Sequence, residues 1–138
     1  MEFVDANILV YAHDAGAGRK RDFAAQLIDR LMAADEGALS TQVLAEFFVV
    51  STRKIASPIT IALAKEIVRD FGDWHVHRPT ADDVLRAIEI SERNRIHFWD
   101  AMIVRSAQAM GASVLWTEDL QADARFGDVR VRNPFAVR

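Results

Sequence analysis

Four acidic residues stand next to or inside apolar stretches, where acids are unusual. They are Asp5, Glu46, Asp100 and Asp119. Asp5 directly follows a short apolar, β-prone stretch, and Asp119 follows another one after Thr117-Glu118, whereas Glu46 and Asp100 are bracketed by large apolar side chains. Carboxylates are rarely buried unless they are paired or bind a cation. These positions therefore indicate chemistry as well as structure.

Each acid also has a purely structural explanation. Asp5 and Asp119 suit the N-cap or turn position at a strand end, and Asp100 suits the first turn of a helix, where its charge is favourable with the helix dipole. Glu46 could line a narrow solvent-facing stripe. Glu118 and Asp123 compete with Asp119 as the fourth acid.

The predicted elements bring the four acids to one place. Asp5 and Asp119 follow predicted strand ends, Glu46 lies one turn into the helix after the second strand, and Asp100 is near the start of the helix that leads to the fourth strand. In a parallel α/β sheet these positions share the carboxyl edge, where ligands bind near the switch in strand order. Four close carboxylates repel one another, and a hard divalent cation such as Mg²⁺ or Mn²⁺ removes the conflict.

A metal bound by such acids can activate a water molecule and stabilise the leaving oxygen of a phosphodiester. Asn7, two residues after Asp5, could orient a ligand or a water molecule, or simply form local turn bonds. Thr117 is a second candidate supporting residue, and it could instead cap the turn before Asp119.

Predicted strands and helices alternate along the chain. Strands are expected at 3–4, 38–41, 74–77, 113–116 and 129–132, the last as an edge strand. Helices are expected behind Asp5, up to about residue 34, and over 43–50, 60–71, 84–91 and 98–110, with a capping box at Thr80–Asp83. The alternation predicts a mostly parallel sheet with helices on both faces. With no linker or repeat, the 138 residues are expected to form one domain, 1–138.

The composition narrows the functional classes. The chain has no cysteine, which excludes disulfides, thiolate catalysis and cysteine-based zinc sites. Its net charge of −3 argues against a passive nucleic-acid coat, but not against an enzyme that holds nucleic acid through a metal. No apolar stretch approaches the roughly 18 residues of a membrane span, and no secretory signal is evident. We therefore expect a cytoplasmic protein that does not bind membranes.

Four motifs, in order, resemble those of PIN-domain proteins, and more closely those of VapC-type toxins from prokaryotic toxin–antitoxin pairs. They are Asp5-Ala6-Asn7 after the first strand, Glu46 after Gln42-Val43-Leu44, Phe98-Trp99-Asp100-Ala101, and Thr117-Glu118-Asp119-Leu120 ahead of a terminal Asn133-Pro134-Phe135. The resemblance covers essentially the whole chain. It implies a three-layer α/β/α sandwich with a mostly parallel central sheet.

The resemblance also implies an activity and partners. It implies a Mg²⁺- or Mn²⁺-dependent endoribonuclease that hydrolyses RNA with a metal-activated water, a homodimer, and a cognate antitoxin whose tail covers the site. The family's metal-binding acids fall on Asp5 and Asp100, with Glu46 and Asp119 completing the set. Arg53 or Lys54 could serve as the basic residue that the family often has after the second strand.

Two other classes remain open at this stage. A Mg²⁺-binding receiver domain of a signalling system would have an acidic pair near the first strand and a lysine at a later strand end, and this sequence has neither. A non-catalytic PIN-like binding subunit is the second alternative.

Weaker signals have ordinary explanations as well. Arg19-Lys20-Arg21 could contact RNA phosphates or form a solvated turn. The pair His75 and His77 suggests surface histidines more than a metal site. Trp99 and Trp116 suggest core packing more than base stacking.

Overall fold

The computed structural model describes residues 1–136, and within them strands and helices alternate as the sequence predicts. The strands are β1 Glu2–Val4, β2 Gly37–Ser40, β3 His75–His77, β4 Val114–Trp116, β5 Arg125–Phe126 and β6 Val129–Arg132. The helices are α1 Ala6–Ala12, α2 Arg19–Ala34, α3 Thr41–Arg53, α4 Ile61–Phe71, α5 Ala81–Asn94 and α6 Phe98–Ala109. None of these helices is long and apolar enough to span a membrane.

The strands form one sheet in the order β3-β2-β1-β4-β6-β5. All neighbouring pairs are parallel except β5 and β6. The chain starts in the middle of the sheet, extends to β2 and β3 on one side of β1, and then returns to β4 on the other side. The strand order therefore switches at β1 and β4, and the crevice outside their carboxyl ends is the usual ligand site of such a sheet.

The predicted edge position of 129–132 is wrong. β6 pairs with β4 on one side and with the two-residue strand β5 on the other, so β5 is the edge. Gly127, with φ of +63°, begins the two-residue turn between β5 and β6. A two-residue strand has too few residues to show an alternating pattern, which is why the sequence did not reveal it.

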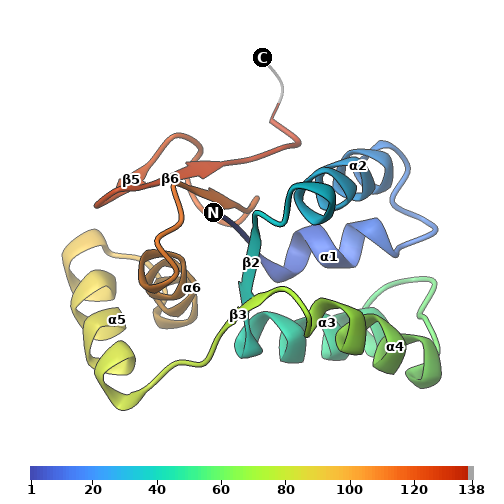
Figure 1. The fold of residues 1–138 in the computed structure, drawn as a ribbon, viewed down its shortest axis with the longest axis horizontal. Coiled ribbons are helices and arrows are strands. Elements are labelled where there is room, and N and C mark those ends of the chain that lie inside the picture. Colours follow the sequence, from blue (N-terminus) through green and yellow to red (C-terminus); the bar gives the residue numbers. More distant parts are fainter. Residues whose placement is uncertain (137–138) are drawn as a thin grey trace.

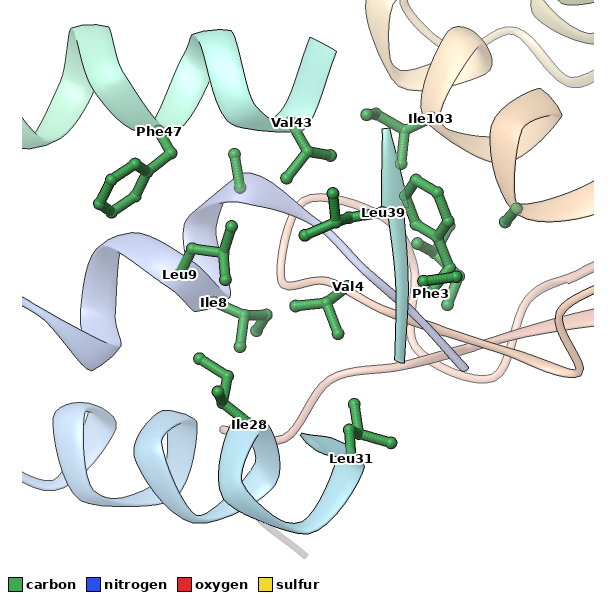
Figure 2. Packing of buried hydrophobic residues seen from close by; sticks show 14 of the residues in the cluster. Phe3, Val4, Ile8, Leu9, Ile28, Leu31, Leu39, Val43, Phe47 and Ile103 are labelled. Carbon is green, nitrogen blue, oxygen red and sulfur yellow. The ribbon is translucent and has the colours of Figure 1, made fainter. Parts of the chain in front are cut away.

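Helices cover both faces of the sheet, as expected for an α/β/α sandwich. Figure 1 shows α5 and α6 on one side of β2, and α1 to α4 on the other. Because successive side chains of a strand point to opposite faces, Phe3 packs towards Ile103 of α6 while Val4 packs towards Ile8 of α1 (Figure 2). The buried β1 strand thus fixes the start of α1, and with it Asp5.

Three helices begin at hydroxyl N-caps. The side chains of Ser40, Thr60 and Thr80 each accept a hydrogen bond from a backbone N–H three residues later. Thr80 and Asp83 form the predicted capping box at the start of α5. Ser40 matters most for the site, because it ends β2 and starts α3, the helix that carries Glu46.

Candidate active site

Asp5 is buried at the carboxyl end of β1, where it is also the N-cap of α1. Its Oδ1 accepts a 2.7 Å hydrogen bond from the backbone N–H of Ala6, and its Oδ2 accepts a 2.8 Å bond from the hydroxyl of Thr117. Its own N–H donates to the carbonyl of Trp116, which extends the pairing of β1 with β4. The capping role and the site position therefore coincide in one residue.

Thr117 and Asn7 connect Asp5 to Asp119. The hydroxyl of Thr117 accepts hydrogen bonds from the Asn7 side chain (3.2 Å) and from the backbone N–H of Asp119 (3.1 Å). Nδ2 of Asn7 also donates to Oδ2 of Asp119 at 3.0 Å. Asp119, which is exposed, is thereby held beside the buried Asp5.

Glu46 is half-buried in the second turn of α3 and is held by Gln42. Nε2 of Gln42 donates to Oε1 of Glu46 at 2.9 Å and to the backbone carbonyl of Trp99 at 3.2 Å. Trp99 precedes Asp100 in the first turn of α6. Gln42 therefore ties the helix that carries Glu46 to the helix that carries Asp100.

Each of the four carboxylates is close enough to at least two of the others for their charges to interact. Burial raises the pKa of Asp5 to about 7, against the bonds from Thr117 and Ala6, and repulsion from Asp119 and Glu46 adds to the rise. Burial also raises the pKa of Glu46, with added repulsion from Asp100 and Asp119. The pKa of Asp100 is raised by burial and then by Asp119. The structure thus brings together the four acids that the sequence selected.

Two cavities meet at these acids. One is a groove of about 600 Å³ between α1 and α3, which reaches Asp5, Glu46 and Asp119 and has mainly apolar walls. The other has a volume of about 460 Å³ and reaches Asp100 and Asp119 from the α5–α6 connection. Asp119 lines both cavities, so the acids are accessible from two sides.

The two rival acids point to other partners. Glu118 accepts hydrogen bonds from the hydroxyl of Tyr11 and from Lys20, the latter at 3.0 Å. Asp123 forms an ion pair of 2.7 Å with Arg130. Neither lines the two cavities at the acids, whereas Asp119 lines both.

Of the basic and aromatic residues singled out in the sequence, some lie at the site and others do not. Lys20 pairs with Glu118 and so does not extend freely from its turn. Lys54 lines the groove, whereas Arg53 is exposed and does not line it. The expectation that Trp99 packs in the core is wrong, because its side chain is 62% exposed.

His77 is not a surface histidine, contrary to the prediction. Its Nδ1 lies 2.9 Å from the buried hydroxyl of Ser106, and its Nε2 lies 3.3 Å from Asp83. Asp83 also accepts a 2.8 Å hydrogen bond from Arg105. This network joins β3 to α5 and α6 and is not connected to the four acids.

The donor chemistry of the site fits a hard divalent cation. It consists of carboxylate oxygens together with two buried side-chain oxygens, Oδ1 of Asn7 and Oε1 of Gln42, that accept no hydrogen bond within the described residues. Among residues 1–136, no three acidic or histidine side chains form a group that could hold a metal ion as they stand. Glu46 and Asp119 are instead held by the amides of Gln42 and Asn7, so the carboxylates would have to close around an ion.

Sequence reasoning missed two features of this site. The bridge from Gln42 to the Trp99 carbonyl depends on how α3 packs against α6, although the i,i+4 spacing of Gln42 and Glu46 was a local signal for half of it. The polar residues Arg93-Asn94-Arg95, between the helices predicted at 84–91 and 98–110, carry no sequence signal that links them to the site. In the structure, Arg95 lines the second cavity together with Asp100 and Asp119.

Known structures share this architecture. The chain superposes on a toxin–antitoxin complex from Klebsiella pneumoniae with a TM-score of 0.73 and 18% identity, covering 99% of this chain and 100% of that one. A sarcin–ricin loop cleaving VapC toxin from Mycobacterium tuberculosis gives a TM-score of 0.65 and 23% identity over 83% of this chain and 87% of that one. DNA-bound VapBC from Salmonella typhimurium gives a TM-score of 0.64 and 17% identity, over 97% of this chain and 98% of that one. No curated protein matches the sequence.

The sequence itself matches the PIN domain family over residues 3–127. This match includes all four acids and every strand except β6 and the first residue of β1. Together with the shared fold, it shows that this chain belongs to the PIN domain family.

Proposed function

We propose that this chain is a divalent-metal-dependent endoribonuclease that acts as the toxin of a type II toxin–antitoxin pair. The observation that carries the proposal is the meeting of four carboxylates at the strand-order switch, three of them with a raised pKa. A protein gains nothing in stability from such mutual repulsion. A bound cation would turn the same arrangement into a site for phosphodiester chemistry.

Each acid has a proposed role. Asp5 and Asp100 would hold the main metal ion, with Glu46 binding it directly or through water. Asp119, as the exposed member, would orient the attacking water in line with the leaving oxygen. When bound, Mg²⁺ or Mn²⁺ would supply a Lewis acid that lowers the pKa of water and stabilises the leaving group.

Asn7, Thr117 and Gln42 would act as positioning residues. Thr117 fixes Asp5, Asn7 fixes Asp119, and Gln42 fixes Glu46, each by a hydrogen bond to the carboxylate. These bonds would keep the acids at the site before an ion binds, and Glu46 and Asp119 would exchange their amide partners for the ion when the carboxylates close around it.

The apolar groove supports an antitoxin as partner. Its walls include Val10, Val49, Val50 and Ile55, and it leads to Asp5 and Glu46. An extended peptide with apolar side chains in the groove and a basic side chain near the acids would match both surfaces. Such a tail would cover the site and block RNA.

A homodimer also forms part of the proposal. Val84, Leu85 and Ile88 on α5 are exposed by 36%, 60% and 42%. They lie on neighbouring positions of one helix face, and a second copy could cover them. Leu85→Glu is expected to yield monomers in sedimentation experiments.

We expect the protein to act in the cytoplasm, where cellular RNA is available.

The test is cleavage of purified cellular RNA by antitoxin-free protein in Mg²⁺ or Mn²⁺. Discrete products should appear, and they should vanish with a chelator and with Asp100→Asn. Asp82→Asn is the matched control, since it removes an equal charge at an exposed ion pair with Arg86 and lines neither cavity at the acids. Failure of the antitoxin-free protein to cut any RNA would contradict the proposal and favour a binding subunit.

A further inference from the structure

Arg95 adopts a backbone conformation that arginine rarely takes. It is the C-cap of α5, with φ of +54° and ψ of +45°, in the left-handed region. Glycine populates this region at no steric cost, whereas an arginine there is strained by its Cβ. Strained residues of this kind gather at functional sites, where their side chains serve a purpose beyond the fold.

Arg95 lines the second cavity at the acids. This cavity also includes His97, Asp100 and Asp119. Arg95 is exposed, and its guanidinium makes no hydrogen bond or ion pair with any residue in the described part of the chain. Its charge is therefore available to a ligand that enters the cavity.

A polyanion needs such a charge to approach this site. RNA carries one negative charge per phosphate. The four carboxylates would therefore repel the phosphates that flank the one to be cleaved. A guanidinium fits phosphate oxygens in a bidentate manner. We propose that Arg95 binds a backbone phosphate of the RNA substrate next to the one that is cleaved. This inference rests on the proposed nuclease function.

The charge of Arg95 favours RNA over a peptide as occupant of this cavity. The antitoxin tail proposed for the groove would bring basic side chains to the acids, and Arg95 would repel them. The groove and the second cavity approach the acids from different sides, so a peptide in the groove does not need the Arg95 side. Arg95 would thus contribute to RNA binding and not to antitoxin binding.

The experiment compares Arg95→Gly, Arg95→Lys and the control Arg69→Ala, which removes an exposed arginine of α4 that lines neither acid cavity. Binding of a fluorescent single-stranded RNA is measured against salt concentration in the Asp100→Asn background, so that the RNA stays intact. RNA cleavage is measured in parallel with Asp100 present. Thermal unfolding is recorded for every variant.

Arg95→Gly is expected to weaken RNA binding about tenfold. It should also reduce the slope of log affinity against log salt by about 0.7, the value of one phosphate contact on a single strand. Its unfolding midpoint should stay equal or rise, since glycine relieves the left-handed strain. Arg95→Lys should retain part of the affinity, and Arg69→Ala should bind as the parent does.

The outcomes separate this inference from the nuclease proposal. Unchanged affinity and salt slope in Arg95→Gly would overturn the phosphate contact, even if the parent enzyme cleaves RNA normally. An Arg95-dependent salt slope in a protein that cleaves no RNA would support the contact and contradict the nuclease. Loss of binding that is matched by a fall in the unfolding midpoint would overturn it, because a purely structural role would then explain the loss.

Discussion

The hydroxyl of Thr117 donates a hydrogen bond of 2.8 Å to Oδ2 of Asp5, and so joins the carboxyl ends of β1 and β4 at the switch in strand order. The direction of this bond is fixed. The same hydroxyl accepts from Asn7 and from the backbone of Asp119, and its single proton is therefore directed at Asp5. Thr117 thus sets the position of Asp5 and opposes the rise in its pKa.

Thr117→Val should therefore impair the site through Asp5. We expect a loss of about 1–3 kcal/mol in stability, because buried partners lose their hydrogen bonds. The pH at which RNA cleavage is half-maximal should also move upward, since a bond that lowers the pKa of Asp5 is lost. Thr117→Ser keeps the hydroxyl and should restore the wild-type pH profile. A valine variant with an unchanged profile would show that the hydroxyl does not act through Asp5.

Asp100→Asn should abolish RNA cleavage, weaken binding of Mn²⁺ and leave the fold intact. The substitution removes one of the charges that raise the pKa of Glu46. In chelator near pH 7.5, the midpoint of thermal unfolding should therefore rise by a few degrees, on the order of 2–4 °C. Calorimetric titration with Mn²⁺ and unfolding scans test the two effects separately. Wild-type turnover would remove Asp100 from its proposed role.

The identity of the fourth acid can be tested with three amide variants made separately. Asp119→Asn should lower cleavage at least about a hundredfold, as removal of a catalytic group commonly does. Glu118→Gln and Asp123→Asn should each stay within about threefold of wild type, because these acids pair with Lys20 and Arg130. A large loss in either of the latter, with Asp119→Asn active, would reassign the position.

The pH dependence of stability should show two buried aspartates acting in opposite directions. The folded-state pKa of Asp5, about 7, lies above its ordinary value of 3.8, so the folded protein binds more protons and loses stability as pH rises from about 4 to 7. Backbone and side-chain hydrogen bonds from Thr80 and Arg105 lower the pKa of Asp83 to about 2. Its contribution is present above about pH 4 and is lost as pH falls towards 2.

In chelator, stability should therefore be greatest at about pH 4 to 5. Denaturant titrations across the pH range measure this curve. Asp5→Asn should reduce the fall in stability between pH 5 and 7. Asp83→Asn should reduce the fall in stability below pH 4. A stability that rises from pH 5 to 7.5 in the absence of metal would contradict the strain assigned to the acid cluster.

The order of elements and the sheet edge that carries the acids could be predicted because their causes are local. Asp5 follows an apolar strand and caps the next helix, and the capping box of Thr80 and Asp83 marks the start of α5 within four residues. Glu46 and Asp100 were recognisable as acids within apolar helices. Their role in metal binding stays a prediction.

The features that sequence could not predict depend on packing between distant segments. Gln42 meets the Trp99 carbonyl across 57 residues, and His77 meets Ser106 across 29. The exposure of Trp99 depends on which face of α6 the sheet covers, and an aromatic residue beside apolar neighbours does not reveal that face. The same holds for Arg95. Neither its left-handed backbone conformation nor its position in the second cavity can be predicted from the residues next to it in the chain.

The chemical ends of the RNA products test the central claim most directly. If water held at the four acids attacks phosphorus, mass spectrometry should find only hydroxyl and phosphate monoester ends, and no products should form with a chelator or with Asp100→Asn. Products that end in a 2′,3′-cyclic phosphate would show attack by the RNA's own 2′-hydroxyl. That result, or cleavage that survives the chelator, would contradict metal-dependent hydrolysis at Asp5, Glu46, Asp100 and Asp119.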